Sequence, residues 1–296
     1  MQEGFDFTVV NEETVLSRIL AETSWARVVR ISLLLSLVMV AFLLKSEALR
    51  WVTLAVTLLY LGFWDGGFLS VSHITSGIWV GATVYLGDLP LLLMVSFTVV
   101  VTILWGRVFC GFLCPFGALQ DFLDRVVPER LKWRVSPDVH RHGFMVKYVV
   151  LGLILIPALA GSHTSLYQYF EPFGTVFFRS RSLLLWSIAT TFLVASAIVP
   201  RFYCRYVCPL GAALALLSLI SLKRIRRVEH CNYCQVCEQS CPTGAIRGGD
   251  IDFKECVRCN ICEIKLIEGA GVCGHELDDV LPRLVPLRVG TSIGSG

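Results

Sequence analysis

The sequence is short of charged residues. Only 17% of its 296 residues are Asp, Glu, Lys or Arg, whereas 55% are hydrophobic. An ordinary soluble domain carries about 25% charged residues, so the low fraction argues against a purely soluble protein. The net charge of +3 is too small to suggest a nucleic-acid partner. The first 27 residues hold no apolar core or small-residue cleavage site, so we expect no cleavable signal peptide.

A disulfide-type cysteine pattern is also missing. The 12 cysteines fall in C-x-x-C and C-x-x-x-C groups, which is typical of metal ligation. No two histidines lie at opposed depths on two apolar segments, so we do not expect a b-type haem. The composition therefore favours a membrane protein that binds metal through thiolates.

The hydrophobic residues gather in long stretches. Crossing about 30 Å of hydrocarbon takes about 20 helical residues. The candidate spans are Val28–Leu44, Trp51–Trp64, Leu89–Gly106, Phe144–Ala160 and Leu183–Val199. Gly77–Leu86 is apolar but short, which leaves six spans as an alternative. We predict a membrane all-α fold, a polytopic helical bundle of five or six spans.

Basic residues predict the orientation of this bundle. Seven Lys and Arg residues lie in the connection 107–147, and six lie in the segment 201–227. Connections rich in Lys and Arg stay in the cytoplasm. We therefore expect both segments on the cytoplasmic side of a bacterial inner membrane, and the connection 161–182 on the opposite side. Five spans place the N-terminus outside and six place it inside.

One nine-residue pattern, C-x-x-x-C-P-x-G-A, occurs at Cys110–Ala118, Cys204–Ala212 and Cys237–Ala245. The first two copies belong to longer segments, 107–118 and 201–212, that repeat at a spacing of 94 residues. Each of these follows an apolar stretch and precedes a predicted helix, at 118–126 and 212–222. Internal repeats reveal architecture. This one predicts two related halves, each bringing a cysteine pair to the same membrane face.

A different cysteine pattern begins after the last apolar stretch. The spacing C-x2-C-x2-C-x3-C-P is the ligand run of bacterial ferredoxins, in which the fourth cysteine ligates the other cluster. The first run is Cys231, Cys234, Cys237 and Cys241, and the second is Cys256, Cys259 and Cys262, followed by Cys273. We predict one [4Fe–4S] cluster on Cys231, Cys234, Cys237 and Cys273, and a second on Cys256, Cys259, Cys262 and Cys241.

Two alternatives remain for these eight cysteines. C-x-x-C pairs also bind zinc, although triplets and singles do not divide into ordinary zinc pairs. The gap before Cys273 is long and Gly274 follows it, so either Cys273 reaches in from a longer loop or three cysteines hold a labile cluster. The predicted organisation is a polar segment (1–27), the bundle (28–222), a two-cluster ferredoxin-like α+β module (223–285) and a flexible tail (286–296).

The paired cysteines of the repeat allow several roles. Their spacing places two thiols on one helical face or on either side of a turn closed by Pro, and helix N-termini and nearby Arg residues stabilise thiolates. Three functional roles are open for the thiols of Cys110, Cys114, Cys204 and Cys208. All four together form one metal or small-cluster site, or each pair binds a soft ion such as Cu(I). In the third role, each pair cycles between dithiol and disulfide. The remaining interpretation is that they only pack a helix-end turn.

The repeated R-x-[FY]-C-x3-C-P-[FL]-G-A motif, followed by the ferredoxin-type run, resembles one known family over residues 89–273. It is similar to the membrane ferredoxin-type proteins of the NapH, MauN, NosR and CcoG group. The resemblance implies a polytopic protein with cytoplasmic [4Fe–4S] clusters that passes electrons between the quinol pool and a respiratory or metal-handling system. It also implies that the eight cysteines from Cys231 to Cys273 are cluster ligands. Length and layout favour the NapH or MauN type, without a periplasmic flavin-binding domain.

We therefore predict a quinol-dehydrogenase-type component that carries electrons between quinol or quinone and a partner protein. The alternatives are a copper reduction or assembly factor for a metalloenzyme, and a redox sensor. Glu171 lies in an aromatic-rich connection whose first interpretation is an interfacial anchor. The alternative there is a quinol site with Glu171 or His163 as proton acceptor.

Overall fold

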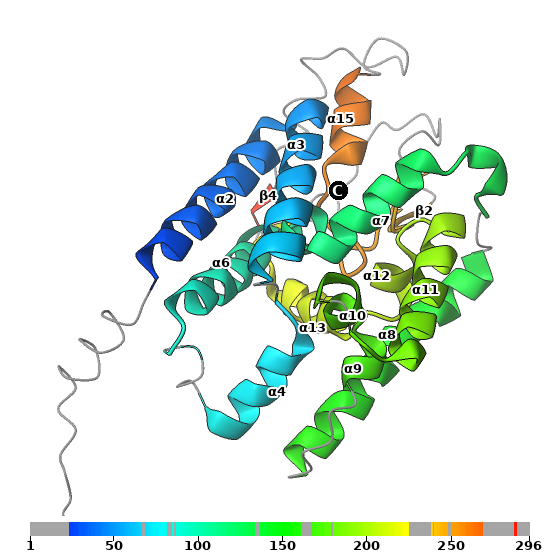
Figure 1. Cartoon of the computed structure of the whole chain (residues 1–296). Coiled ribbons are helices and arrows are strands. Elements are labelled where there is room, and N and C mark those ends of the chain that lie inside the picture. Colours follow the sequence, from blue (N-terminus) through cyan, green and yellow to red (C-terminus); the bar gives the residue numbers. More distant parts are fainter. Residues whose placement is uncertain are drawn as a thin grey trace, which may run out of the picture.

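The computed structural model describes residues 24–66, 69–81, 85, 87–133, 137–160, 167–178, 180–224, 238, 240–247, 250–268 and 287–288. These residues are mostly helical (Figure 1). The α-helices are α2 (Trp25–Leu44), α3 (Glu47–Thr57), α4 (Val71–Val80), α6 (Leu89–Trp105), α7 (Pro115–Val126), α8 (Pro137–Leu159), α9 (Tyr167–Phe170), α10 (Phe173–Phe178), α11 (Leu183–Ile198), α12 (Phe202–Tyr206), α13 (Pro209–Leu217) and α15 (Ile261–Glu268).

Short elements complete this list. The π-helical segment η1 (Leu58–Asp65) continues α3, and η2 (Phe109–Leu113) follows α6. Two 3-10 turns are η3 (Glu129–Leu131) and η4 (Ser218–Ile220). Strand β1 (Lys223–Arg224) pairs antiparallel with β4 (Leu287–Arg288), and β2 (Ile246–Arg247) pairs with β3 (Asp250–Ile251). The flexible tail predicted for 286–296 stays a prediction, since Leu287 and Arg288 are its described residues.

All five apolar stretches are helical, which confirms the helical class. By length and apolar composition, α2 and the part of α8 from His142 to Leu159 are long enough to cross a bilayer. The apolar helices Leu89–Trp105, Leu183–Ile198 and Pro209–Ile220 are shorter. The number of spans therefore stays a prediction.

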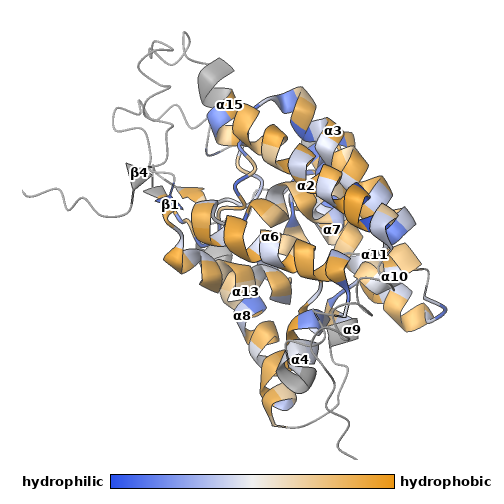
Figure 2. Cartoon of the chain, turned by 90° about the vertical axis from the view of Figure 1, so that its left-hand side faces the viewer, coloured by the Kyte–Doolittle hydropathy of each residue, from blue (hydrophilic) through white to orange (hydrophobic). Residues whose placement is uncertain are grey.

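The outward faces of several helices are apolar. Figure 2 shows hydrophobic residues along α2, α6 and α13. Leu44 of α2 is 66% exposed and Ile156 of α8 is 67% exposed. Only 33% of the apolar window of α2 and 28% of that of α8 are buried within the protein. A helix in the core of a soluble protein would bury most of such a window.

The sequence repeat is a repeat of structure. Helices α6 and α11 begin 94 residues apart, at Leu89 and Leu183, and the side chains of Asp88 and Ser182 accept the first-turn N–H groups that cap them. Helices α7 and α13 begin with Pro at the same spacing. The halves pack crosswise, since α7 contacts α11 and α13 contacts α6. This crossed packing brings the two cysteine motifs together.

The second cysteine run does not form a separate body. Val257 and Cys259 belong to the same buried core as residues of α2, α6 and α12. Figure 1 shows α15, which follows Cys259, beside α3. The predicted module boundary at residue 223 stays a prediction, and Val257 and Cys259 pack against the helices of the bundle.

Candidate functional site

The paired cysteines lie at the turns between helices. Cys114 and Cys208 are the residues that cap α7 and α13, each followed by Pro at the first helical position. The Cys114 Sγ accepts the Gly117 N–H at 3.4 Å, and the Cys208 Sγ accepts the Gly211 N–H at 3.2 Å. A side-chain acceptor at this position satisfies a backbone donor that the helix leaves unpaired. Of the two predicted arrangements, the turn closed by Pro is therefore the observed one.

The four paired cysteines share one buried core. Cys110, Cys114, Cys204 and Cys208 are each at most 9% exposed. They are close enough that the charge of one thiolate would raise the pKa of others, notably Cys204 acting on Cys114 and Cys208. Burial is the largest cause and raises the pKa of all four thiols, and it raises that of Cys204 to about 11. The expected stabilisation of thiolate by Arg and by helix N-termini is present but is outweighed.

Gln120 of α7 connects one of these thiols to the second half. Its Nε2 donates to the Cys204 Sγ at 3.1 Å, and its Oε1 accepts from the Ser196 hydroxyl at 3.1 Å. Gln120 is fully buried. Its amide therefore fixes the position of Cys204 relative to α7 and α11.

The repeated arginines bind the opposite halves. Arg201 donates to the backbone oxygen of Cys110 at 3.1 Å, and Arg107 donates to that of Gly211 at 3.2 Å. Arg201 also holds the Asp121 carboxylate with two hydrogen bonds of 2.6 and 2.8 Å, and Arg50 is a second partner of this carboxylate. Although burial opposes it, these two cations lower the pKa of Asp121. A buried carboxylate with two Arg partners thus joins the motifs rigidly.

The second cysteine run surrounds a small pocket. Its lining includes all four residues predicted for the second cluster, which are Cys241, Cys256, Cys259 and Cys262. Cys241 reaches this pocket from a turn fifteen residues before Cys256, as the crossing rule of two-cluster ferredoxins requires. The structure therefore brings together the predicted ligand set.

The backbone of this pocket fits an anionic cluster. Arg258 and Asn260 have positive φ angles of 51° and 61°. Turns that contain left-handed residues direct successive N–H groups into concavities, which are common at iron–sulfur sites. The backbone N–H groups of Arg258 and Ile261 act on the Cys256 and Cys259 sulfurs and lower the pKa of these thiols, although burial raises it more.

Arginine charges face the same pocket. Burial raises the pKa of Cys256 to about 12, while Arg258 lowers it. Burial also raises the pKa of Cys259, while Arg50 and Arg201 lower it. Among the described residues, the Nε atoms of Arg50 and Arg258 are buried without a hydrogen-bond partner. Bound metal displaces thiol protons, and these cations would then compensate the negative charge of the ligands.

The cysteine loop is held tightly against the paired-cysteine motif. A Cβ placed on Gly111 would lie 2.5 Å from the Val257 backbone oxygen and 3.3 Å from the Cα of Cys259. Only a glycine permits this approach. The backbone of the first motif therefore touches the backbone of a predicted cluster ligand.

Two carboxylates of the cysteine segment anchor it to the helices. Glu255 pairs with Lys147 and accepts from the Tyr148 hydroxyl at 3.3 Å, and Arg107 lies 3.7 Å away. Glu263, at the start of α15, pairs with Lys45 at 2.9 Å. Both carboxylates are at most 4% exposed. Breaking a buried ion pair is costly, so the loop has a fixed position on the bundle.

Some predicted ligands cannot be placed. Cys231, Cys234, Cys237 and Cys273 lie outside the described residues, as does His163. Within the described part of the chain, no three Cys, His, Asp or Glu side chains are arranged to hold a single metal ion. The metal role predicted for the paired cysteines stays a prediction.

Sequence reasoning missed several residues of this site. Gln120 and Asp121 are polar neighbours on the buried face of α7. Glu255 directly precedes the second cysteine run, and Asn260 lies within it. The signal for the first two was available, because adjacent polar residues sit among the apolar positions of an amphipathic helix. No local pattern marks Glu255, whose Lys147 and Arg107 partners are distant in sequence.

Two known protein families match the cysteine-containing parts of this chain. A family described as "4Fe-4S binding domain" matches residues 88–134 and 182–227, which are the two structural repeats with their cysteine pairs. A second family with the same description matches residues 226–247, which include the first ferredoxin-type run. The uncharacterised protein MJ0750 of Methanocaldococcus jannaschii is 30% identical over 56% of this chain and 71% of its own length.

Two relatives with descriptive names match part of this chain. NosR of Pseudomonas aeruginosa, a regulatory protein, is 36% identical over 57% of this chain and 25% of its own length. The ferredoxin-type protein NapH of Escherichia coli is 28% identical over 44% of this chain and 46% of its own length. The chain belongs to the membrane-associated ferredoxin-type proteins.

The two family matches show that the chain contains 4Fe-4S binding domains. It spans a quarter of NosR and less than half of NapH. No solved structure matches it.

Proposed function

We propose that this ferredoxin-type protein is a membrane-bound electron carrier between quinol and a redox partner, with two [4Fe–4S] clusters on its cytoplasmic side. The observation that carries this proposal is the direct contact between Gly111 of the first motif and the loop of Cys256 and Cys259. This contact joins the helical bundle to the ligand pocket without an intervening layer. An electron that reaches the paired cysteines is then close to the second cluster site.

Membrane insertion is supported by the outer surface. Only 33% of the apolar window of α2 and 28% of that of α8 are buried within the protein, and Figure 2 colours much of α2 as hydrophobic. A contiguous exposed apolar surface marks a membrane or protein interaction. The polytopic bundle, with the cysteine loop at its cytoplasmic end, accounts for this surface and for the basic residues in connections 107–147 and 201–227.

The residues of the pocket have defined tasks in this proposal. Cys256, Cys259, Cys262 and Cys241 hold one cluster, which when bound accepts and donates single electrons. The backbone N–H groups of Arg258 and Ile261 act on two of the ligand sulfurs and lower the pKa of the Cys256 and Cys259 thiols. Hydrogen bonds to ligand sulfurs are one of the factors that set the reduction potential of such a group. Ion pairs of Glu255 and Glu263 hold the cysteine loop against the helices. They thereby fix the distance between this loop and the first paired-cysteine motif.

A second candidate function is metal reduction or assembly for a metalloenzyme. The observation that favours it is the gathering of four buried thiols, Cys110, Cys114, Cys204 and Cys208, in one core. Soft thiolate ligands select ions such as Cu(I). In this case the bound ion would be cargo and the clusters its electron source.

Quinol-driven cluster reduction separates the candidates. Anaerobically purified, oxidised protein in lipid nanodiscs is mixed with a decyl-substituted benzoquinol, and reduced clusters are followed by EPR. The comparison protein carries serine at all four paired cysteines. We expect the wild type to be reduced by quinol, and the variant to keep clusters that dithionite reduces but quinol reduces far more slowly. Stoichiometric copper that disappears in the variant, with no reduction by quinol in either protein, would instead establish the second candidate.

A further inference from the structure

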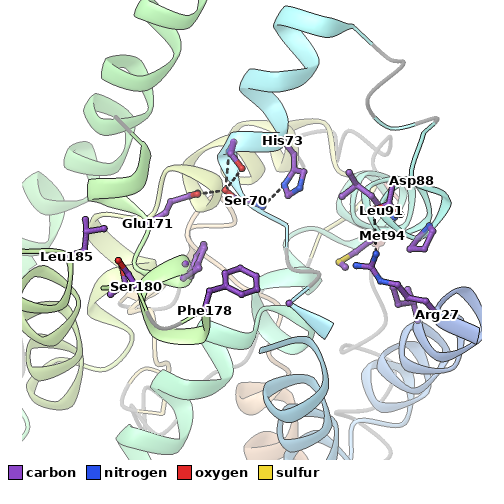
Figure 3. A pocket seen from close by; sticks show the side chains of 17 residues that line it. Arg27, Ser70, His73, Asp88, Leu91, Met94, Glu171, Phe178, Ser180 and Leu185 are labelled. Atoms are coloured by element: carbon purple, nitrogen blue, oxygen red, sulfur yellow. Dashed lines mark hydrogen bonds and ion pairs between the residues drawn. The ribbon is translucent and has the colours of Figure 1, made fainter. Parts of the chain in front are cut away.

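A cavity of about 470 Å³ lies on the other side of the paired cysteines. It is bounded by the first turns of α4 and α6, by the segment leading into α10, and by parts of α2 and α11. Figure 3 shows Ser70, His73, Met94 and Glu171 in its lining. Phe173 and Gly174 line it as well. A mostly apolar cavity with a few convergent polar groups is typical of a small-molecule site.

Glu171 is the buried acid of this cavity. It is 6% exposed, and its Oε1 accepts the Val71 N–H at 2.9 Å while its Oε2 accepts from the Ser70 hydroxyl. Among the ion pairs of the described residues, none involves Glu171. Burial is the largest cause that raises the pKa of Glu171, to about 7. A carboxyl with this pKa exchanges its proton near neutral pH.

His73 stands across Ser70 from Glu171, as Figure 3 shows. Its Nδ1 accepts the Ser70 N–H at 3.2 Å. In the neutral ring the proton is then on Nε2, which is available as a donor. Burial lowers the pKa of His73 and so favours this neutral form. The cavity therefore offers one proton acceptor and one hydrogen-bond donor.

Aromatic rings connect the cavity to the paired cysteines. Phe173 lines the cavity, and its ring centroid lies 5.3 Å from that of Phe116 and 5.8 Å from that of Tyr203. Phe116 and Tyr203 are 5.0 Å apart, and the Tyr203 hydroxyl donates to the Phe170 oxygen at 2.8 Å. Phe116 and Tyr203 belong to the two cysteine motifs. A packed route thus leads from the cavity through these rings to the cysteines, and from Gly111 to the cluster loop.

We propose that this cavity binds the ring of a quinol and that Glu171 accepts one of its protons. The inference rests on the proposed function and assigns its quinol site. The quinol loses two electrons and two protons to become a quinone. The electrons pass one at a time to the clusters, one proton goes to the Glu171 carboxylate, and the other is released to solvent near Asp88, whose side chain is 43% exposed. His73 donates from Nε2 to a ring oxygen.

Gly174 offers a test that does not touch the acid. A Cβ on Gly174 would meet no atom within 4 Å, so Gly174→Leu extends into the cavity without a clash at its base. Gly152 of α8 is equally open but does not line the cavity, which makes Gly152→Leu the matched control. Using the decyl-substituted benzoquinol, we expect Gly174→Leu to raise the KM about tenfold or more, as displacing a well-fitted ring group would. Gly152→Leu should keep the wild-type KM.

Glu171→Gln tests the proton acceptor. The reduction rate of the clusters by quinol should rise with pH through about 7 in the wild type, because Glu171 must be deprotonated to accept the proton. In Glu171→Gln the rate should fall about 100-fold or more and lose this pH dependence. The other titratable or charged groups that face this acid are His73 of α4, Tyr203 of α12, and Arg27 and Asp88 at the far wall.

The outcomes of these experiments distinguish an error in the proposed quinol site from an error in the proposed function. Reduction by dithionite should be unchanged in both variants. If quinol fails to reduce the wild type, the proposed function is wrong. If quinol reduces the wild type and both variants equally well, electron transfer stands but this cavity is not the quinol site.

Discussion

Replacing Gly111 by alanine tests the contact on which electron transfer depends. The added Cβ would lie 2.5 Å from the Val257 oxygen and 3.3 Å from the Cα and N of Cys259. All three are backbone atoms, so no side-chain rotation relieves the clash and the cysteine loop must move. Overpacking of this kind costs about 1–3 kcal/mol. Alanine recovers about 0.5–1 kcal/mol because it is less flexible than glycine in a helix. The net loss lies between about 0 and 2.5 kcal/mol, and the upper part of this range is expected because all three contacts are to backbone.

The assay reads both stability and electron transfer. Thermal loss of the iron–sulfur absorbance is followed at a fixed heating rate, and cluster reduction by quinol is followed by EPR. Gly152→Ala is the control, since its Cβ meets no atom within 4 Å on α8. We expect Gly111→Ala to lower the midpoint of cluster loss by several degrees and to slow reduction by quinol. The reasoning is refuted if Gly111→Ala matches Gly152→Ala in both measurements.

Three further predictions concern buried charges. Asp121→Asn leaves Arg201 without its carboxylate and should lower the free energy of unfolding by about 3–5 kcal/mol. The control Asp124→Asn breaks a partly exposed pair with Lys132 and should cost at most about 1 kcal/mol in the same thermal assay. Equal losses in the two variants would contradict this prediction. Glu255→Gln should release the cysteine loop and speed iron loss to a chelator, and an unchanged rate would count against the anchoring role. Because the pKa of Glu171 is raised from 4.5 to about 7, the folded state binds its proton more tightly, so stability should fall by roughly 3 kcal/mol as pH rises from about 4.5 to 7. Glu171→Gln should lack that fall, and an identical pH slope in both proteins would show the assignment to be wrong.

The local features of this chain could be read from its sequence. The five apolar stretches are helical, and the repeat at 94 residues reappears as paired helices with equivalent caps. Pro after Cys114 and Cys208 fixes where α7 and α13 begin. These features depend on neighbours along the chain, and their patterns carry the information directly.

The tertiary contacts could not be read in the same way. Asp121 holds Arg201 across 80 residues, and Lys147 holds Glu255 across 108. The sequence predicted a separate ferredoxin-like module because the apolar stretches stop before the second cysteine run. That pattern did not indicate that Cys259 packs in the same buried core as residues of the bundle. A close backbone approach such as that at Gly111 depends on chain crossing, which no local pattern records.

Iron and acid-labile sulfide analysis of anaerobically purified protein tests the central claim most directly. For two [4Fe–4S] clusters the account predicts about eight iron and eight sulfide per chain. Serine at Cys241, Cys256, Cys259 and Cys262 should remove about half of each. Wild-type protein without iron and sulfide, or a variant that keeps the full content, would contradict the account.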